Sequence, residues 1–314
     1  MPRLAVALLT SVVALATLSG CGALRAGSPT TGPATGAATS VAGSIPVGSS
    51  SHTIQVDGQT RSYLAYRPAD VAEPVPLVMM LHGGFGSAAQ AESAYGWDAK
   101  ADAEHFVVVY PDGDGRAWNV GGGCCGAPGR TNVDDVAFLS AVVGDVTSSL
   151  PIDASRVFAT GISNGGMMAY RLACDTELFA AIGADSATLL GDCPSPHPLS
   201  VLAIHGTADR NIPYDGGQGS GFAKIDGPSI LDVNQLWRTA DSCAAATSTS
   251  ESRVATLTAS CPDSRTVELI TIEGAGHQWP GSTKGRQGAD TPYPDLDATR
   301  VIWEFFAAHP GASS

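Results

Sequence analysis

The sequence predicts an α/β protein in which a mostly parallel central sheet carries helices on both faces. Continuous apolar runs of strand length end in turn residues, as at Pro76–Leu81 and Phe106–Tyr110, which is typical of buried parallel strands. A helical apolar spacing follows in residues 136–150, ending at Pro151. Most informatively, a Gly-x-Ser-x-Gly motif, residues 161–165, separates an apolar run from a helical pattern.

Strand, sharp turn and helix around this motif are the pattern of the nucleophile elbow of the α/β-hydrolase fold. Ser163 would have a strained backbone there and an exposed hydroxyl at the top of the sheet. Side chains at Gly161 and Gly165 would collide with neighbouring backbone. The N–H of Asn164, at the helix start, would face a developing oxyanion. Because the motif alone is a weak signal, the prediction depends on partner residues downstream.

Length and charge limit the alternatives. The chain has 314 residues, of which 44% are hydrophobic, and this indicates one domain of about 260 residues with a tail. Residues 1–50 carry two of the 17 basic residues and no acid, so residues 51–314 carry 15 basic and 30 acidic residues, a net charge of −15. Such a body should repel nucleic acids and anionic membrane surfaces.

The N-terminus resembles an export signal. Arg3 precedes an apolar segment, Leu4–Leu18, that is short for a membrane-spanning helix. The segment ends in Leu-Ser-Gly-Cys21, which resembles a bacterial lipobox. We therefore predict a lipoprotein signal peptide over residues 1–20 and lipidation of Cys21, with a plain secretory signal as the alternative. Membrane contact would then occur only through the lipid anchor.

Residues 21–51 consist of the lipidated cysteine and a stretch rich in Gly, Ser, Thr, Ala and Pro. Such a composition cannot build a core and predicts a flexible tether, which would span about 30 Å. The catalytic domain is predicted to occupy residues 52–314.

Six cysteines remain besides Cys21, and an even number in an exported protein indicates three disulfides. Proximity along the chain favours Cys174–Cys193 and Cys243–Cys261. The other two, Cys124 and Cys125, are adjacent, and consecutive α-carbons lie closer than a relaxed disulfide prefers. Their pairing therefore stays open. No Cys-x-x-Cys motif indicates a metal site.

The first half of the domain begins with a predicted hairpin over residues 52–66. The strand ending at Leu81 runs into His82-Gly-Gly-Phe-Gly86, a loop that in this fold supplies the second oxyanion donor. We assign Gly84 to that role, with Phe85 as the alternative; an ordinary turn into a helix over 88–103 is the other interpretation. The loop Trp118–Gly126 either lines the cleft or is a surface loop.

A capping box is predicted at Thr131-x-x-Asp134. Asp134 and Asp135 are interpreted as first-turn charges of the helix over 136–150 rather than as catalytic acids. After the elbow, strands are predicted at 179–183 and 199–204, a helix at 230–240, and a surface insertion at 243–261. The loop after the strand at 199–204 contains Asp209, our candidate for the acid that orients a histidine, with Asp215 as the alternative.

The last predicted strand, 266–272, leads into a glycine-bounded loop with His277, the candidate general base. A helix over 296–306 would close the domain. The other six histidines lack both this late position and the loop: His52, His82, His105, His197, His205 and His309. We interpret His82 and His205 as structural.

Ser163, Asp209 and His277 thus follow the chain order of an α/β-hydrolase triad. A serine hydroxyl needs a base within hydrogen-bond reach, and imidazole titrates near neutrality. The carboxylate would fix the tautomer of the imidazole and stabilise its protonated form.

Several ordered motifs over about residues 52–308 resemble the polyhydroxybutyrate depolymerase and feruloyl esterase family, which includes lipid-anchored bacterial members. The motifs are Leu81-His-Gly-Gly, Tyr110-Pro-Asp-Gly, Trp118-Asn with Cys124-Cys-Gly, Val133-Asp-Asp-Val, Gly161-Ile-Ser-Asn-Gly-Gly-Met, Ile204-His-Gly-Thr-Ala-Asp and Gly276-His-Gln-Trp-Pro-Gly. The resemblance implies a secreted serine esterase without cofactor or metal, with the triad at Ser163, Asp209 and His277. Trp279 matches the family's tryptophan after the histidine, either a cleft wall or a packing residue.

The sequence therefore predicts hydrolysis of short hydroxyalkanoate oligomers, or of acyl or feruloyl esters on polysaccharide. Gly84, Trp118, Tyr214 and Trp279 are expected to line the substrate pocket. A separate substrate-binding domain, as expected of an enzyme that attacks solid polymer, is not evident. The alternative function is a binding lipoprotein of the cell envelope that keeps the fold without the chemistry. Oligomeric state is not predicted.

Overall fold

The computed structural model describes residues 44–282 and 289–311. The signal segment, Cys21 and most of the tether lie outside these residues. The predicted domain start at residue 52 is wrong, because strand β1 begins at Gly48 and Ile45 is only 1% exposed in the core. Residues 48–51 pair with residues 64–67 of the next strand. This pairing uses the backbone, so a Gly- and Ser-rich composition does not prevent it.

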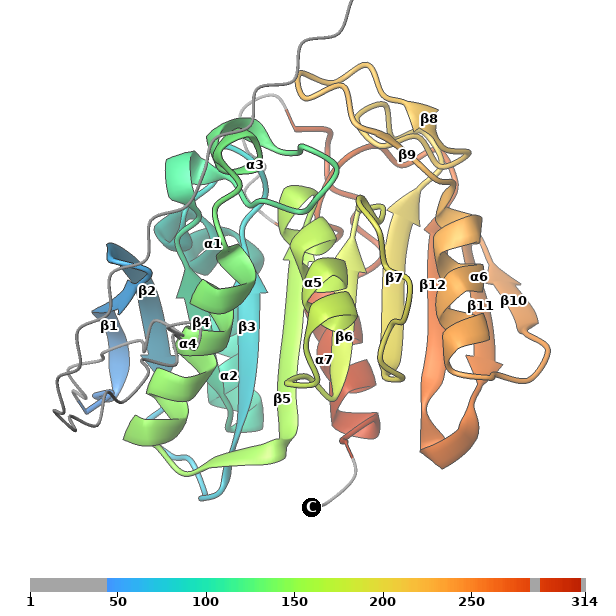
Figure 1. Ribbon diagram of the computed structural model, residues 1–314. Helices are drawn as coiled ribbons and strands as arrows, with labels where there is room; N and C mark the ends of the chain where they lie inside the picture. The colour runs from blue at the N-terminus through green and yellow to red at the C-terminus, as the bar shows by residue number, and fades with distance from the viewer. Residues whose placement is uncertain (1–43, 283–288, 312–314) are drawn as a thin grey trace, which may run out of the picture. The chain divides into compact units, whose positions relative to one another are not determined.

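A ten-stranded sheet forms the centre of the domain, in the order β1-β2-β4-β3-β5-β6-β7-β12-β11-β10 (Figure 1). The six strands from β4 to β12 in that order pair in parallel, whereas β1, β2, β10 and β11 pair antiparallel at the two edges. The strands are β1 Gly48–Val56, β2 Gln59–Arg67, β3 Val75–Leu81, β4 Val107–Pro111, β5 Ile152–Ile162, β6 Ala181–Asp185, β7 Ser200–Gly206, β10 Thr247–Glu251, β11 Val254–Ser260 and β12 Thr266–Ile272.

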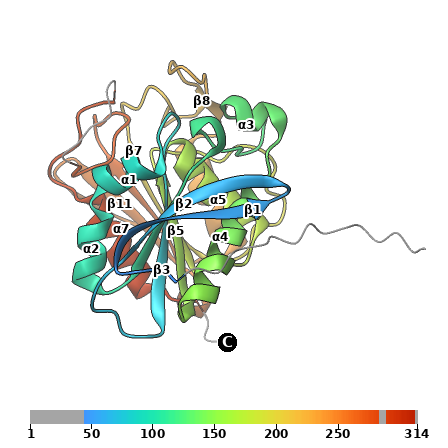
Figure 2. The same cartoon turned by 90° about the vertical axis from the view of Figure 1, so that its left-hand side faces the viewer.

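Helices cover both faces of this sheet, as predicted, and the α/β-hydrolase fold class is confirmed (Figures 1 and 2). One face packs against α4, α5 and α6, and the other against α1, α2 and α7, in two separate hydrophobic clusters. All residues of β3, β4, β6 and β7 are buried, as expected for strands covered on both sides. The helices are α1 Ala88–Tyr95, α2 Trp97–Glu104, α3 Gly126–Thr131, α4 Asp135–Ser149, α5 Asn164–Asp175, α6 Ile230–Ala240 and α7 Ala298–Ala308.

Two helix predictions need correction. The helix predicted over 88–103 is two helices, since the chain turns at Gly96, whose φ is 73°. The capping box is also wrong: Thr131 ends α3, and Asp134 itself caps α4 by accepting the N–H of Ala137. Asp135 is fully buried and binds Arg61 at 2.7 Å, so it anchors β2 to α4.

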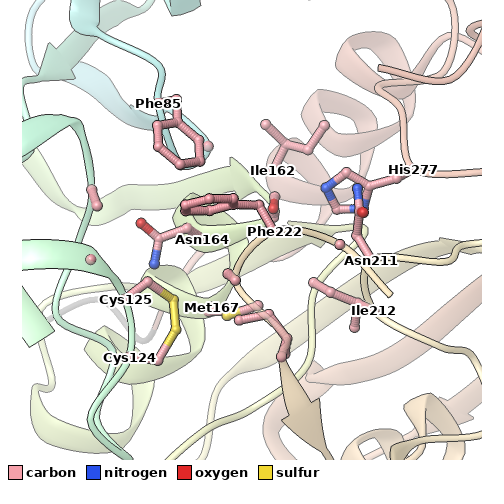
Figure 3. A pocket seen from close by; sticks show the side chains of 18 of the residues that line it. Phe85, Cys124, Cys125, Ile162, Asn164, Met167, Asn211, Ile212, Phe222 and His277 are labelled. Carbon is pink, nitrogen blue, oxygen red and sulfur yellow. A yellow bond between two sulfur atoms is a disulfide. The ribbon is translucent and has the colours of Figure 1, made fainter. Parts of the chain in front are cut away.

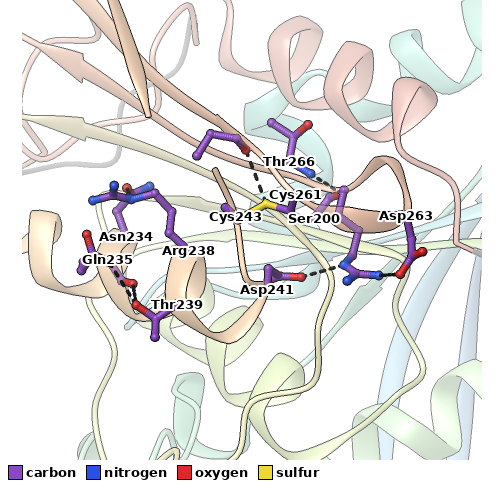
Figure 4. The surroundings of a disulfide bond; sticks show 12 residues. Ser200, Asn234, Gln235, Arg238, Thr239, Asp241, Cys243, Cys261, Asp263 and Thr266 are labelled. Atoms are coloured by element: carbon purple, nitrogen blue, oxygen red, sulfur yellow. Dashed lines mark hydrogen bonds and ion pairs between the residues drawn. A yellow bond between two sulfur atoms is a disulfide. The ribbon is translucent and has the colours of Figure 1, made fainter. Parts of the chain in front are cut away.

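The segment 243–261 is not a surface insertion but mainly the hairpin β10–β11, which extends the sheet beyond β12. The Cys243–Cys261 disulfide closes its base, next to the 2.7 Å ion pair between Asp241 and Arg265 (Figure 4). Cross-strand pairing is a long-range property, and the many Ser, Thr and Ala residues here hide the strand pattern.

The other two disulfides are Cys174–Cys193, at the end of α5, and Cys124–Cys125, in the loop before α3. The structure therefore contains both pairs favoured by proximity and also the pair that the sequence left open. Within the described residues, no helix combines the length and the apolar character needed to cross a membrane.

The common direction of the parallel strands indicates where a ligand site is expected. Since β3, β5, β6, β7 and β12 run in the same direction, their carboxyl ends lie at one edge of the sheet. Ligands of open α/β sheets bind at that edge.

Candidate active site

Ser163 occupies the turn between β5 and α5, and its backbone is strained. Its φ of 57° and ψ of −124° are unusual for a non-glycine residue. Two hydrogen bonds maintain the turn: the Ser163 N–H donates to the Asp185 carbonyl at 2.9 Å, and the Ser163 carbonyl accepts the Met167 N–H at 2.8 Å. The strand-turn-helix of the sequence motif is therefore present with the strained geometry expected of an elbow.

The two motif glycines allow the elbow to pack against β3. A Cβ on Gly165 would lie 2.2 Å from the Leu81 carbonyl oxygen, and one on Gly161 would lie 2.5 Å from the Gly165 carbonyl carbon. Both contacts involve backbone atoms, which cannot rotate away as a side chain does.

Gly165→Ala is expected to lower the free energy of unfolding by about 3 kcal/mol or more, because overpacking displaces backbone. Gly144→Ala is the matched control, since a Cβ there meets nothing within 4 Å in the middle of α4. It should raise stability by about 0.5–1 kcal/mol. Urea titration of both variants measures the difference, and equal stability of the two would contradict the packing argument.

Asp209 and His277 are hydrogen-bonded to each other. The His277 Nδ1 lies 2.7 Å from the Asp209 Oδ2, and the Asp209 Oδ1 accepts the N–H groups of Asn211 and Ile212. The backbone N–H of His277 donates to Asp290 at 2.7 Å. Hydrogen bonds therefore hold both carboxylate oxygens of Asp209. His277 is held through its ring nitrogen Nδ1 and through its backbone N–H.

Burial opposes ionisation of Asp209, but the hydrogen bond and charge of His277, together with the Ile212 N–H, outweigh it, so the pKa of this carboxyl is lowered. A second imidazole, that of His205, has its Nε2 3.5 Å from the Asp209 Oδ2 and 2.9 Å from the Ile212 carbonyl. Burial lowers the pKa of His205. A neutral His205 donates to that carbonyl and supports the Asp209 loop, in agreement with its structural assignment.

Sequence reasoning missed Asp185, at the end of β6. This carboxyl is buried, and its Oδ2 has no hydrogen-bond partner among the described residues. Burial, together with the nearby charge of Asp209, raises the pKa of Asp185 well above its usual range. The two carboxyls are therefore shifted in opposite directions, because the pKa of Asp185 is raised and that of Asp209 is lowered.

Ser163, Asn164 and His277 line one pocket of about 830 Å³ together with Gly84 (Figure 3). Apolar side chains form much of its wall, including Ile162, Met167, Leu190, Ile212 and Ile225. The Cys124–Cys125 disulfide also faces it, so the glycine- and cysteine-rich loop lines the cleft. Asp215 does not line this pocket.

The loop after β3 lies against the elbow. A Cβ on Gly84 would lie 3.8 Å from the Asn164 Cβ, and one on Gly83 would lie 3.5 Å from the Ser163 Cβ. Asn164 is the first residue of α5, so its N–H has no carbonyl partner four residues earlier in the helix. The alternative donor fits poorly, because the Phe85 N–H donates to the Arg116 carbonyl at 2.7 Å.

Two predicted pocket residues do not line the pocket. Trp118 is 0% exposed, and its Nε1 donates to the His82 carbonyl. The Asn164 amide also binds both backbone groups of Trp118, at 2.7 and 3.1 Å, so this tryptophan supports the elbow from inside. Tyr214 turns away from the cleft, with its hydroxyl 2.9 Å from the Thr271 Oγ1.

Trp279 is both a wall of the cleft and a packing residue, the two alternatives that the sequence left open. It borders the pocket, yet it is buried, donates from Nε1 to Thr299 and packs against Tyr95.

Phe222 also lines the cleft, although the sequence analysis did not predict it there. It lies in a polar, glycine-rich segment that shows no apolar pattern. This segment forms the small hairpin of β8 Gly217–Gln218 and β9 Asp226–Gly227.

His82 lies beneath the loop after β3, fully buried, with its Nε2 accepting the Gly113 N–H at 2.9 Å. Burial lowers the pKa of His82. The folded state therefore holds it neutral, whereas the unfolded chain protonates it below about pH 6.5. The contribution of His82 to stability is present above that pH and decreases as the pH falls.

We expect the unfolding free energy of the native protein to fall by about 1 kcal/mol more than that of His82→Gln between pH 7.5 and 5.5. The glutamine oxygen can still accept from Gly113, so the variant removes the titration and keeps an acceptor. Urea unfolding at the two pH values measures both slopes. Identical slopes would show that His82 does not titrate differently on unfolding.

Among the described residues, no group of three or more His, Cys, Asp or Glu side chains is arranged to hold a metal ion.

Comparison with known proteins supports a common ancestry. A family model described as esterase PHB depolymerase matches residues 61–213. "Putative esterase NocK" of Nocardia uniformis subsp. tsuyamanensis is 34% identical over 274 residues, which cover 75% of this chain and 75% of that protein. Feruloyl esterase C of Emericella nidulans is 31% identical over 81% of this chain and 86% of its own. The chain spans only about half the length of several other curated relatives.

Among solved structures, an acetyl xylan esterase from Aspergillus awamori matches with a TM-score of 0.59 at 16% identity, over 82% of this chain and 99% of its own. This likeness supports the α/β-hydrolase fold. Since two relatives above 30% identity align over at least 75% of their own lengths, the chain belongs to the polyhydroxybutyrate depolymerase and feruloyl esterase family.

Proposed function

We propose that the protein is a serine hydrolase of carboxylic esters that works through an acyl-enzyme. The observation that carries the proposal is the 2.7 Å hydrogen bond between Asp209 and His277 in a pocket that also contains Ser163 on a strained turn. Since Nδ1 of His277 faces Asp209, the other ring nitrogen, Nε2, is available for proton transfer.

In the first half-reaction, the Ser163 Oγ attacks the ester carbonyl carbon while His277 Nε2 accepts the hydroxyl proton. The carbonyl oxygen becomes an anion, which the N–H groups of Asn164 and Gly84 stabilise. Loss of one such donor typically costs about 3 kcal/mol. The carbon–oxygen bond to the alcohol then breaks, and His277 returns the proton to the leaving oxygen.

In the second half-reaction, His277 removes a proton from water, and the resulting hydroxide attacks the acyl-enzyme. When this intermediate collapses, the bond between the acyl carbon and the Ser163 Oγ breaks, His277 returns its proton to Oγ, and the carboxylic acid is released. Asp209, with its lowered pKa, remains ionised and stabilises the imidazolium that forms in both halves.

The proposed substrates are short hydroxyalkanoate oligomers, or acyl or feruloyl esters of polysaccharide. The apolar wall of the pocket suits the acyl part of such esters. Family membership and the name of the Emericella relative support the same range of substrates.

We also propose that the enzyme is exported and attached to the membrane through a lipid on Cys21. Three disulfides support an oxidising compartment. The native protein should occur in the membrane fraction with a lipid mass on the peptide that begins at Cys21; an unmodified Cys21 in a protein released into the medium would contradict the anchor.

The experiment that tests the catalytic proposal is labelling with a fluorophosphonate while the turnover of p-nitrophenyl butyrate is followed. One adduct per chain, located by mass spectrometry on the peptide containing Ser163, should abolish turnover. An adduct on another residue, or turnover in a fully labelled sample, would contradict the assignment.

A further inference from the structure

Cationic side chains line the cleft of this otherwise acidic protein. Four of the 17 Lys and Arg residues lie outside the described residues, which leaves 13 against 30 Asp and Glu. Three of these cations line the cleft, Arg116, Arg130 and Lys224, against two acids, Asp226 and Asp290. Asp290 is engaged by the backbone N–H of His277. The cleft therefore reverses the charge balance of the rest of the surface.

None of the three cations forms an ion pair with a carboxylate in the part of the chain that the structure describes, whereas six other cations do. Arg116 donates from Nε to the Gly86 carbonyl and from Nη2 to the Phe85 carbonyl. Lys224 reaches only the Ser220 carbonyl, at 3.3 Å. No carboxylate of the described residues 44–282 and 289–311 therefore forms an ion pair with these three charges.

Two exposed aromatic rings accompany these cations. Phe85 is 50% exposed and Phe222 is 88% exposed, and both line the cleft, with ring centroids 5.4 Å apart (Figure 3). Phe85 has a φ of 64°, an unusual conformation for a bulky residue. Arg116 holds it there, since its carbonyl accepts the Phe85 N–H and its guanidinium binds the Phe85 carbonyl. Strain that the structure maintains in this way is typical of functional positions.

The cations and rings belong to the same two loops. Arg116 is bonded to the backbone of Phe85, and Lys224 closes the turn that carries Phe222, through its N–H to the Gly221 carbonyl. A ligand at this mouth thus meets apolar faces beside positive charge. An uncharged sugar could accept hydrogen bonds from these cations but would supply no counter-charge, whereas a short apolar chain that ends in a carboxylate matches both the rings and the charges.

We propose that Arg116, Arg130 and Lys224 bind a free carboxylate on the ester substrate, while Phe85 and Phe222 contact its apolar chain. The substrate class is then the acid form of linear hydroxyacid oligomers, cleaved near the carboxyl end of the chain. This inference rests on the proposed esterase function and specifies its substrate.

The test compares the linear dimer of 3-hydroxybutyrate as the free acid with the same dimer capped as its primary amide. The scissile ester is identical, and only the carboxylate differs. The ratio of kcat/KM for acid over amide should exceed one at low salt. It should fall about fivefold in the double variant Lys224→Gln with Arg130→Gln, because two exposed charge pairs are lost. Lys224→Glu, which changes the local charge by the same two units, should lower it by a similar factor. Lys100→Gln, which removes the same charge on α2 away from the cleft, should leave the ratio unchanged.

Salt provides an independent readout. At 1 M salt charges are screened within about 3 Å, so the native protein should lose its preference for the acid. An acid-to-amide ratio below one at low salt, or a ratio that Lys224→Glu does not change, would overturn the carboxylate site. So would failure to cleave either dimer while p-nitrophenyl butyrate is hydrolysed. Failure of the esterase proposal itself would give a different result from failure of the carboxylate site. In that case p-nitrophenyl butyrate would not be hydrolysed at all, or the Ser163→Ala variant would hydrolyse it as fast as the native protein.

Discussion

Ser163→Ala is expected to lower kcat for p-nitrophenyl butyrate by roughly 10⁶-fold, the usual loss when a triad nucleophile is removed. The methyl group cannot form the acyl-enzyme, so only binding and the oxyanion donors remain. Because the Ser163 backbone forms the hydrogen bonds that hold the turn, and the hydroxyl does not cap α5, the variant should fold like the native protein.

Burst kinetics with p-nitrophenyl esters and thermal unfolding provide the two measurements. The native protein should release one equivalent of p-nitrophenolate per chain before the steady state if deacylation is slow, and the variant should show no burst. Equal melting temperatures of the native protein and the variant would show that the loss of activity comes from the missing hydroxyl and not from unfolding. Activity within about tenfold of the native protein, in a preparation free of contaminating esterase, would exclude Ser163 as the nucleophile.

Asp209→Asn is expected to lower kcat by about 10⁴-fold with little change in KM. The amide oxygen can still accept the N–H groups of Asn211 and Ile212, which leaves the amide nitrogen facing His277. That nitrogen donates to Nδ1, so the imidazole proton moves to Nε2. His277 can then no longer accept the Ser163 proton, and the imidazolium loses its counter-charge.

Asp290→Asn is the matched control, because Asp290 binds the same histidine through its backbone rather than its ring. The amide oxygen can still accept that N–H, so kcat should stay within about threefold of the native value. Similar losses of kcat in both variants would mean that Asp209 controls the position of the His277 ring rather than its tautomer. Burst kinetics with both variants decide between these outcomes.

Much of this fold was predictable because its signals are local. The hairpin at residues 52–66, the buried strands and the helix at 230–240 follow from periodicity and turn residues, which neighbours in the chain determine. The disulfides Cys174–Cys193 and Cys243–Cys261 were predictable for the same reason, since each closes a short loop.

The errors concern contacts between distant segments. Hairpin β10–β11 was predicted as an insertion because its sequence is polar and its stability comes from pairing with β12. Trp118 and Tyr214 were predicted to line the pocket from the loops that carry them, but the direction of each side chain depends on what packs beneath the loop. For Trp118, that partner is Asn164, which is 46 residues away.

By itself, the sequence determined the buried strands of the parallel core, the elbow motif and the chain order of Ser163, Asp209 and His277. These are properties of adjacent residues, and each candidate follows a strand whose apolar pattern identifies it. Only the tertiary structure decided that His277 meets Asp209, that Trp118 is buried, and that Phe222 reaches the cleft beside Phe85. Such contacts join segments tens to more than a hundred residues apart, and their geometry depends on how the whole sheet and its covering helices pack.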